Sequence, residues 1–296
     1  MIQRQAGATP ARGIVFMLLS FMFLTFGDAV SKLLTTTYAV GQIIVARSVV
    51  ILVIALVICV WQGTAASIRP QSWSNQMRRA AYFVASTFLA NWSFKLLPLA
   101  VAHAILFATP ILITALAPVL LGEKVGIRRW SAVIAGFIGV VLIIDPLHAE
   151  WQWLAIVPLC AALTAALRDL ATREIAGAET TMSLLIFMAA STAVAGVMTL
   201  PFGWAVPTLP DLGLMLVFGL TTTIALYLQV LAFRAAEAGL LAPFKYSTIL
   251  WSILLSFVLW GYTPTASMLL GVAIVVGSGL FILQRELALW RKRSAS

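Results

Sequence analysis

The sequence is poor in the residue types that build metal sites, disulfides and catalytic motifs. Its 296 residues include two cysteines, two histidines and only 10% charged residues. Cys59 and Cys160 both fall inside apolar segments without metal-ligand spacing, so they indicate packing and say nothing of the redox compartment. The chain also lacks a His-Glu-x-x-His metal pattern, a Gly-x-Ser-x-Gly elbow and a phosphate loop. We therefore predict no catalytic activity, no metal site and no cofactor.

Apolar residues make up most of the chain. Hydrophobic residues account for 62% of it, and the mean hydropathy is +1.03. Soluble domains have about a quarter of their residues charged, far more than this sequence. Apolar runs of about 20 residues, enough to cross a bilayer as helices, recur along the whole length. The composition predicts an all-α integral membrane protein, surrounded by the lipid bilayer and without a soluble domain.

Apolar windows between turn and charge signals predict ten transmembrane helices. The connections between them are mostly short, so consecutive helices are expected to be antiparallel neighbours in a bundle. The predicted spans are 14–34, 41–61, 80–97, 101–121, 129–146, 151–172, 182–202, 211–233, 240–260 and 266–284.

Lysine and arginine gather at alternate connections. They precede the first predicted span and follow the second, fourth, sixth, eighth and tenth, whereas the opposite connections contain neither residue. The residues are Arg4, Arg12, Arg69, Arg78, Arg79, Lys124, Arg128, Arg129, Arg173, Arg234, Arg285, Arg291, Lys292 and Arg293. By the positive-inside rule, both termini are expected to be cytoplasmic. The net charge of +9 is therefore a topology signal, and no nucleic acid partner is predicted.

Two stretches in corresponding places share the pattern of an acid, two small or apolar residues, a hydroxyl and a base. They are Asp28-Ala29-Val30-Ser31-Lys32 and Asp169-Leu170-Ala171-Thr172-Arg173. Residues four apart lie on one face of a helix, so each acid is expected to lie beside its own base. The alternative is that these charges sit near helix ends and only snorkel to the membrane surface.

The two stretches also indicate an internal duplication. A second, weaker echo relates Leu121-Gly122-Glu123 to Trp260-Gly261-Tyr262 at nearly the same offset. Since five spans is an odd number, two homologous halves must cross the membrane in opposite orientations, the inverted repeat common among secondary transporters. We predict one repeat at 1–146 and the other at 147–296.

The motifs also resemble a known family. The residues that carry the resemblance are Phe26-Gly27-Asp28-Ala29-Val30-Ser31-Lys32, Arg47, Pro110, Leu121-Gly122-Glu123, Ala242-Pro243-Phe244-Lys245-Tyr246 and Gly277-Ser278-Gly279-Leu280. Together they are similar to the EamA family of the drug/metabolite transporter superfamily. That resemblance implies two inverted five-helix repeats and transport of small metabolites across a bacterial inner membrane. Tyr262 stands where the family often repeats the glutamate of its Leu-Gly-Glu motif. The resemblance leaves the cargo open, because similar members export amino acids or import S-adenosylmethionine or riboflavin.

Polar residues inside the predicted spans are the candidates for substrate binding, because ionisable groups at membrane depth usually face a partner or a cavity. For Lys32 and Lys95, snorkelling to the surface is the alternative. Trp92 and Tyr246 are included because they adjoin polar candidates, although interfacial or lipid-facing packing is the more common role of such aromatics. The predicted substrate-binding residues are Asp28, Lys32, Arg47, Asn91, Trp92, Arg168, Asp169, Lys245 and Tyr246.

The sign of these charges predicts the class of cargo. Within the spans, five cations face two acids; they are Lys32, Arg47, Lys95, Arg168 and Lys245 against Asp28 and Asp169. Such an interior favours a carboxylate or zwitterion, so the small-molecule substrate is predicted to be an amino acid or a related solute. The alternatives are riboflavin or S-adenosylmethionine and, from another functional class, a membrane scaffold or receptor.

Five residues are expected to serve gating, structure, hydrogen bonding or proton binding. Pro110 and Pro243 interrupt helices, as gating kinks or as tolerated ones. Glu123 is expected to form a surface ion pair with cations of its own loop. Asp28 is a better candidate than Glu123 for a group that binds a transported proton. His103 is expected to be a hydrogen-bonded histidine at a helix start. Small residues in the fifth and tenth spans favour internal packing, and the chain is predicted to be a monomer or a homodimer.

Overall fold

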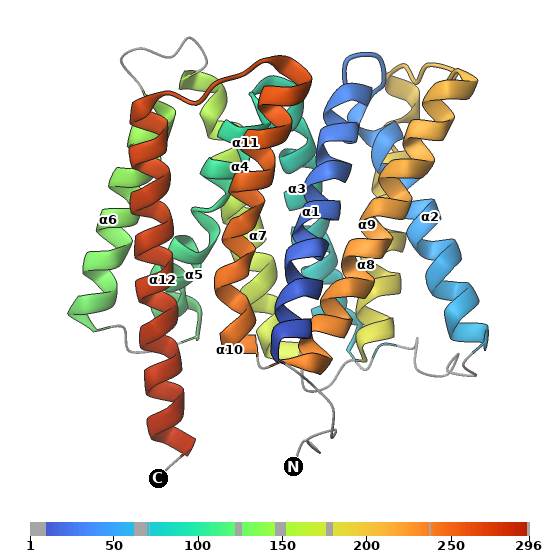
Figure 1. Cartoon of the computed structure of the whole chain (residues 1–296). Coiled ribbons are helices and arrows are strands. Elements are labelled where there is room, and N and C mark those ends of the chain that lie inside the picture. Colours follow the sequence, from blue (N-terminus) through green and yellow to red (C-terminus); the bar gives the residue numbers. More distant parts are fainter. Residues whose placement is uncertain are drawn as a thin grey trace.

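The computed structural model describes residues 10–61, 70, 72–121, 126–145, 152–175, 180–236 and 238–294. These residues form a helical bundle, and none of them lies in a β-strand. Figure 1 shows the helices running side by side, with the start of α1 and the end of α12 at the same face of the bundle. We call this the terminal face, and the other, which carries the turn between α1 and α2, the opposite face. An all-α membrane bundle is thereby confirmed.

The first half of the chain crosses the bundle five times. Its helices are α1 (Pro10–Leu34), α2 (Val40–Trp61), α3 (Trp73–Leu96), α4 (Leu99–Leu106), α5 (Thr109–Leu121) and α6 (Ile127–Ile144). The α4 and α5 helices share one crossing. The second half repeats this pattern with η2 (Gln152–Ala155), α7 (Ile156–Ile175), α8 (Thr181–Val197), η3 (Leu200–Phe202), α9 (Leu209–Ala235), α10 (Ala238–Leu241), η4 (Ala242–Tyr246), α11 (Ser247–Trp260) and α12 (Ala266–Ser294). Here α10, η4 and α11 share a crossing.

Seven helical segments are long and apolar enough to cross a membrane, judged by length and composition among the described residues. They are Ala11–Leu34, Val40–Trp61, Leu99–Leu120, Trp153–Thr172, Leu209–Ala235, Pro243–Trp260 and Ala266–Gln284. Two shorter apolar helices, Trp130–Ile144 and Met182–Val197, complete the pattern together with the more polar α3. The protein is therefore a multi-pass membrane protein.

The third crossing begins earlier than predicted. The predicted span started at 80, because Arg78 and Arg79 ended the apolar window, but α3 begins at Trp73. Ser72 caps its first turn by accepting a hydrogen bond from the Asn75 amide. Assigning Arg79 to a connecting loop was wrong, since its side chain is buried in the bundle.

The fourth crossing was predicted as one helix, 101–121, and is instead broken between α4 and α5. Pro110 has no amide hydrogen and so cannot donate to the carbonyl of Leu106. The Thr109 hydroxyl takes that position and donates to the Leu106 carbonyl at 2.7 Å. The predicted interruption at Pro110 is thus confirmed, and the freed acceptor is satisfied by a side chain.

Helix pairing follows the same rule in both halves. The α1 helix packs on α9 as α3 packs on α7, and α2 on α9 as α3 on α8. Three further pairs, α2 with α8, α4 with α11 and α6 with α12, join helices of equal rank in the two halves. Exchanging the first five crossings for the second five therefore leaves these pairs between the halves unchanged.

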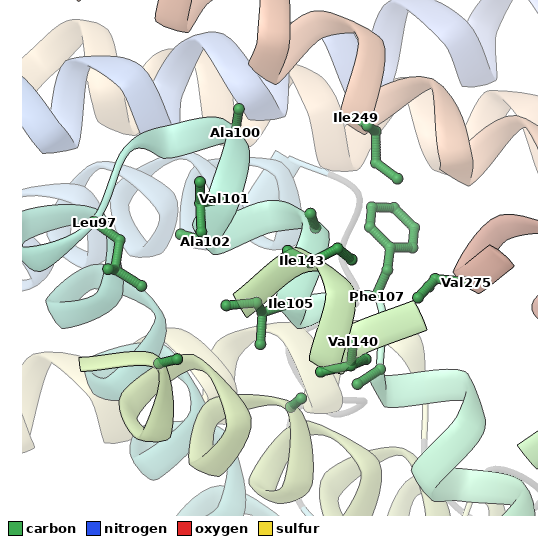
Figure 2. Close-up of a cluster of buried hydrophobic side chains, with 14 of the residues drawn as sticks. Leu97, Ala100, Val101, Ala102, Ile105, Phe107, Val140, Ile143, Ile249 and Val275 are labelled. Atoms are coloured by element: carbon green, nitrogen blue, oxygen red, sulfur yellow. The ribbon is translucent and has the colours of Figure 1, made fainter. Parts of the chain in front are cut away.

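The most deeply buried part of the bundle surrounds α4. Leu99, Ala100, Val101 and Ala102 are fully inaccessible, and they belong to one buried cluster with residues of α6, α11 and α12. Figure 2 shows the Phe107 ring of the α4–α5 break lying beside Ile249 and Val275. In a bilayer, such contacts stabilise through close van der Waals packing, to which small residues contribute by letting backbones approach. The α4 helix is consequently a fixed element against which neighbouring polar residues are held.

Candidate functional site

Two groups of polar side chains lie at different depths of the bundle. The first polar cluster consists of Asp28, Ser31, Lys32, Asn91 and His103, toward the opposite face. The second polar cluster consists of Arg168, Asp169 and Lys245, toward the terminal face. The depth of each cluster follows from where its residues lie along their helices. The α1 helix ends soon after Asp28, and α7 ends soon after Asp169.

The centre of the first polar cluster is a contact between α1 and α4. The Asp28 Oδ2 and His103 Nε2 atoms are 3.1 Å apart, and the two side chains are 15% and 7% exposed. His103 Nδ1 lies 3.0 Å from the Leu99 carbonyl, and its ring stacks on Phe94 with centroids 5.0 Å apart. The expected hydrogen bonding of His103 is confirmed, but its expected place at a helix start was wrong, because His103 lies in the last turn of α4. Its partner Asp28 is 75 positions away and was not predicted.

Lys32 does not pair with Asp28, which corrects the prediction based on their spacing of four. The Lys32 Nζ donates to the carbonyls of Phe94 and Leu97, at 2.6 and 2.7 Å, where α3 ends. It also lies 5.5 Å from the centre of the Trp260 ring. A cation at a helix C-terminus is attracted by the carbonyls that lack helical partners. Lys32 therefore joins α1 to the α3–α4 connection.

Asn91 and Trp92 point to different surroundings despite being neighbours. Asn91 is buried and accepts a hydrogen bond of 2.7 Å from Ser31, which fixes its amide against α1. Trp92 is 51% exposed on the outside of α3. The structure thus brings Asn91 into the first polar cluster and leaves Trp92 outside it.

Arg47 of α2 lies apart from these hydrogen bonds but within electrostatic range of Asp28. Its guanidinium carbon is 5.4 Å from the centre of the Phe218 ring on α9. Its Nε is buried and has no hydrogen-bond partner among the described residues. A buried donor without an acceptor is costly, most of all on a charged group, and a ligand that accepted a hydrogen bond from it would relieve that cost.

The second polar cluster contains a different local pair from the predicted one. Arg168 donates from Nε and Nη2 to Asp169 Oδ1, at 2.8 and 2.7 Å, and its guanidinium lies 5.6 Å from the Phe83 ring. The predicted partner of Asp169, Arg173, has a side chain outside the described residues. Lys245 of η4 is accessible and lies within electrostatic range of both Asp169 and Arg168.

Tyr246, next to Lys245, contacts the other half of the chain. Its ring stacks on that of Phe107, with centroids 5.1 Å apart. Phe107 and Tyr246 are 139 positions apart, the same separation as Gly122 and Gly261 in the echo between the halves. That offset was a signal from which Phe107 could have been identified. Pro243 lies in η4, where the helical crossing changes geometry, and Glu123 lies outside the described residues.

Arg79 of α3 connects three helices near the second polar cluster. Its Nε donates to the Thr172 hydroxyl of α7 at 2.9 Å, and its Nη1 donates to the Leu184 carbonyl of α8 at 3.4 Å. Sequence reasoning assigned it to topology alone. The signal that it missed is the Ser72 cap, which places Arg79 inside a helix.

An apolar groove of about 360 Å³ lies elsewhere, on the outer surface of α6. Its lining residues are Ile134, Phe137, Ile138, Val141 and Leu142. This composition is typical of a lipid-facing surface. None of the predicted site residues lines the groove.

Comparison with known proteins agrees with this architecture. Residues 11–145 match the EamA-like transporter family, a range that covers the first five crossings. Over 276 residues, 93% of this chain and 94% of its relative, the sequence is 26% identical to an S-adenosylmethionine uptake transporter of Rickettsia bellii. The predicted relationship to the EamA family of the drug/metabolite transporter superfamily is confirmed. These relatives support a transporter of small metabolites.

Two further relatives carry another cargo in their names. A riboflavin transporter of Rhizobium johnstonii is 29% identical over 196 residues, which span 66% of this chain and 65% of that protein, less than two thirds of its length. A riboflavin transporter of Vibrio cholerae is 24% identical over 281 residues, 94% of either chain. A crystal structure of a protein 18% identical to this chain has a TM-score of 0.65 and covers 93% of this chain and 98% of its own, which shows a shared fold.

Proposed function

We propose that this protein transports S-adenosylmethionine, or a solute that joins a zwitterionic amino acid end to an aromatic base. The observation that carries the proposal is the buried Nε of Arg47, which has no hydrogen-bond partner among the described residues, on a guanidinium within electrostatic range of Asp28. A guanidinium suits the carboxylate of an amino acid, and a carboxylate side chain suits its ammonium. The full-length similarity to S-adenosylmethionine uptake transporters supports the same cargo.

The structure changes how the charge count applies to this cargo. Lys32 is bound by backbone carbonyls, Lys95 is exposed, and Arg168 is paired with Asp169. Of the cations counted in the spans, Arg47 and Lys245 keep a charge without a paired acid among the described residues. The surplus of positive charge is therefore smaller than the sequence indicates, and a solute that bears a sulfonium beside its zwitterion is acceptable. The relatives also give no support to a plain amino acid as cargo.

Riboflavin is the second candidate, because a riboflavin transporter is 29% identical over two thirds of this chain. Its isoalloxazine ring is neutral and planar, so it has no need of the Arg47 and Asp28 charges. Stacking between rings such as Phe107 and Tyr246 is the type of contact that would hold it. The two candidates thus depend on different residues.

The setting of the transporter is part of the proposal. We place the protein in the bacterial inner membrane with the terminal face on the cytoplasmic side, as the distribution of Lys and Arg indicates. The exchange symmetry of the helix pairs supports two inverted repeats, 1–146 and 147–296. Monomer and homodimer both remain compatible with this arrangement.

Counterflow in proteoliposomes tests the cargo. Vesicles are loaded with unlabelled solute, and the entry of the labelled solute is compared for S-adenosylmethionine, methionine and riboflavin, with protein-free vesicles as the control. Counterflow of S-adenosylmethionine that excess methionine does not abolish supports recognition of both ends of the solute. Flux of riboflavin alone contradicts the charge-based proposal in favour of the second candidate. Binding without flux of any of the three favours a receptor.

A further inference from the structure

The hydrogen bonds of His103 determine where one of its protons lies. Nδ1 is 3.0 Å from the Leu99 carbonyl, and a carbonyl oxygen can only accept a hydrogen bond. Nδ1 therefore carries a hydrogen. In the neutral ring the other nitrogen, Nε2, then has only a lone pair to present.

Nε2 is 3.1 Å from Asp28 Oδ2, within hydrogen-bond distance. A lone pair facing an ionised carboxylate is repulsive, so this contact needs a proton between the two atoms. The proton sits either on Nε2, giving imidazolium and carboxylate, or on Oδ2, giving neutral imidazole and carboxylic acid. In both forms the pair holds one proton more than the fully deprotonated pair.

We propose that Asp28 and His103 form a proton-binding site, and that a cationic group of the solute displaces this shared proton from Asp28. The ammonium or sulfonium then takes the place of the proton beside the carboxylate, and His103 becomes a neutral imidazole as one proton leaves. Charge is conserved at the site. The protein is thereby an exchanger of protons for a cation-bearing solute. The exchange step rests on the proposed function, whereas the shared proton does not.

The surroundings limit which other groups can influence this proton. From α1, Lys32 is one turn away, with its amine bound to carbonyls; from α2, Arg47 attracts the Asp28 carboxylate. Among the side chains that the structure describes, the other charged groups on elements packed against α1 and α4 are Arg78, Arg79 and Lys95 on α3, Arg168 and Asp169 on α7, Asp211 and Arg234 on α9 and Lys245 on η4. The α10 and α11 helices carry no charged residue.

The location of the pair relates the proton to the conformation of the bundle. Asp28 lies on α1, which packs on α9 of the other half, whereas His103 lies on the deeply buried α4. With the proton present, the pair attracts α1 to α4. Without it, the carboxylate faces a lone pair and the contact is weakened unless a solute cation replaces the proton. Proton and solute therefore bias the same helix contact in alternation.

Nitrogen NMR of the histidines tests the shared proton without any solute. The chain has only two histidines, so H148Q leaves His103 as the single reporter. His148 lies outside the described residues. In H148Q protein we expect the Nδ1 chemical shift of a protonated nitrogen and the Nε2 chemical shift of a nitrogen that shares a hydrogen bond with a carboxyl group, and we expect D28N to change the Nε2 shift. Identical Nε2 shifts with and without D28N would overturn the proposal.

Proton release tests the exchange step. S-adenosylmethionine is added to the full-length protein in weakly buffered detergent with a pH-sensitive dye. We expect about one proton released per solute bound, and none for D28N, if ammonium and proton compete for the same carboxylate. Binding without proton release contradicts the exchange step and leaves the proposed cargo intact. Absence of binding contradicts the proposed cargo, and the NMR shifts then decide the proton site alone.

Discussion

Phe107 and Tyr246 stack at 5.1 Å and occupy matching positions in the two halves of the chain. Each belongs to the fourth crossing of its half, at the place where that crossing loses regular α-helical geometry. Because irregular backbone at membrane depth is tolerated only when protein or water surrounds it, two breaks that meet can shield each other. The stack is therefore a direct contact between the two elements best suited to local rearrangement.

The first prediction concerns Gly279 of α12, which lies against the hydroxyl group of Tyr246. A Cβ added at Gly279 of α12 would overlap the Tyr246 hydroxyl. We expect G279A to displace the ring and to lower the free energy of unfolding by about 1–3 kcal/mol, the usual cost of overpacking. Thermal unfolding in detergent measures the loss, and counterflow shows whether the displaced ring also slows transport.

The same helix offers a matched control. A Cβ added at Gly277 meets nothing within 4 Å, so G277A is expected to leave stability unchanged or to raise it by up to about 1 kcal/mol, as alanine does in helices. Adding Y246F to G279A removes the overlapping hydroxyl and should restore part of the loss. Equal destabilisation by G277A and G279A would show that the Tyr246 contact has no special role.

Lys32 provides the second prediction. Replacing it with methionine removes a cation from the Phe94 and Leu97 carbonyls at the end of α3. Hydrogen bonds to charged groups contribute about 1.5–3 kcal/mol each. K32M is therefore expected to lower the free energy of unfolding by at least about 1.5 kcal/mol. K95M is the control, since Lys95 is an exposed lysine at the same helix end. If K95M destabilises the protein as much as K32M, Lys32 only snorkels.

Several features of the fold were predictable because they depend on composition. Apolar length identified the crossings, and Pro110 identified the break after α4, since a missing amide hydrogen acts locally. The start of α3 was not predicted, because hydropathy treats buried arginine as a loop signal. In the structure, Arg79 is satisfied by hydrogen bonds to α7 and α8, which a hydropathy window cannot represent.

The site was predictable only in part, for a similar reason. The spacing of four between Asp28 and Lys32 correctly implies one helix face, but it does not rank Lys32 against partners on other helices. His103 competes for Asp28, and the end of α3 competes for Lys32. Both competitors arise from packing between helices, and neither leaves a periodic trace in the sequence.

Arg79 and Thr172 allow a direct test of such a contact between helices. Their hydrogen bond of 2.9 Å joins α3 to α7. In a double-mutant cycle of R79M and T172V we expect a coupling energy of about 1 kcal/mol or more in unfolding experiments, because the donor is charged. Additive effects of the two substitutions would show that Arg79 is held by its other contacts and that Thr172 is dispensable.

Arg47 provides the prediction that separates a binding role from a structural one. If its guanidinium, with its unpartnered Nε, serves to bind the solute, R47M removes a costly buried charge and should leave thermal stability unchanged or raise it. The same substitution should lower kcat/KM for S-adenosylmethionine by roughly 10- to 150-fold, the equivalent of losing a charge-assisted hydrogen bond.

R47K keeps the charge without the planar donor pair, so its kcat/KM is expected to lie between that of R47M and that of the unsubstituted protein. R234M, at an exposed arginine of α9, is the control and should change neither quantity. A protein that R47M destabilises while transport per folded molecule stays normal would place Arg47 among the structural residues, and the zwitterion proposal would lose its main support.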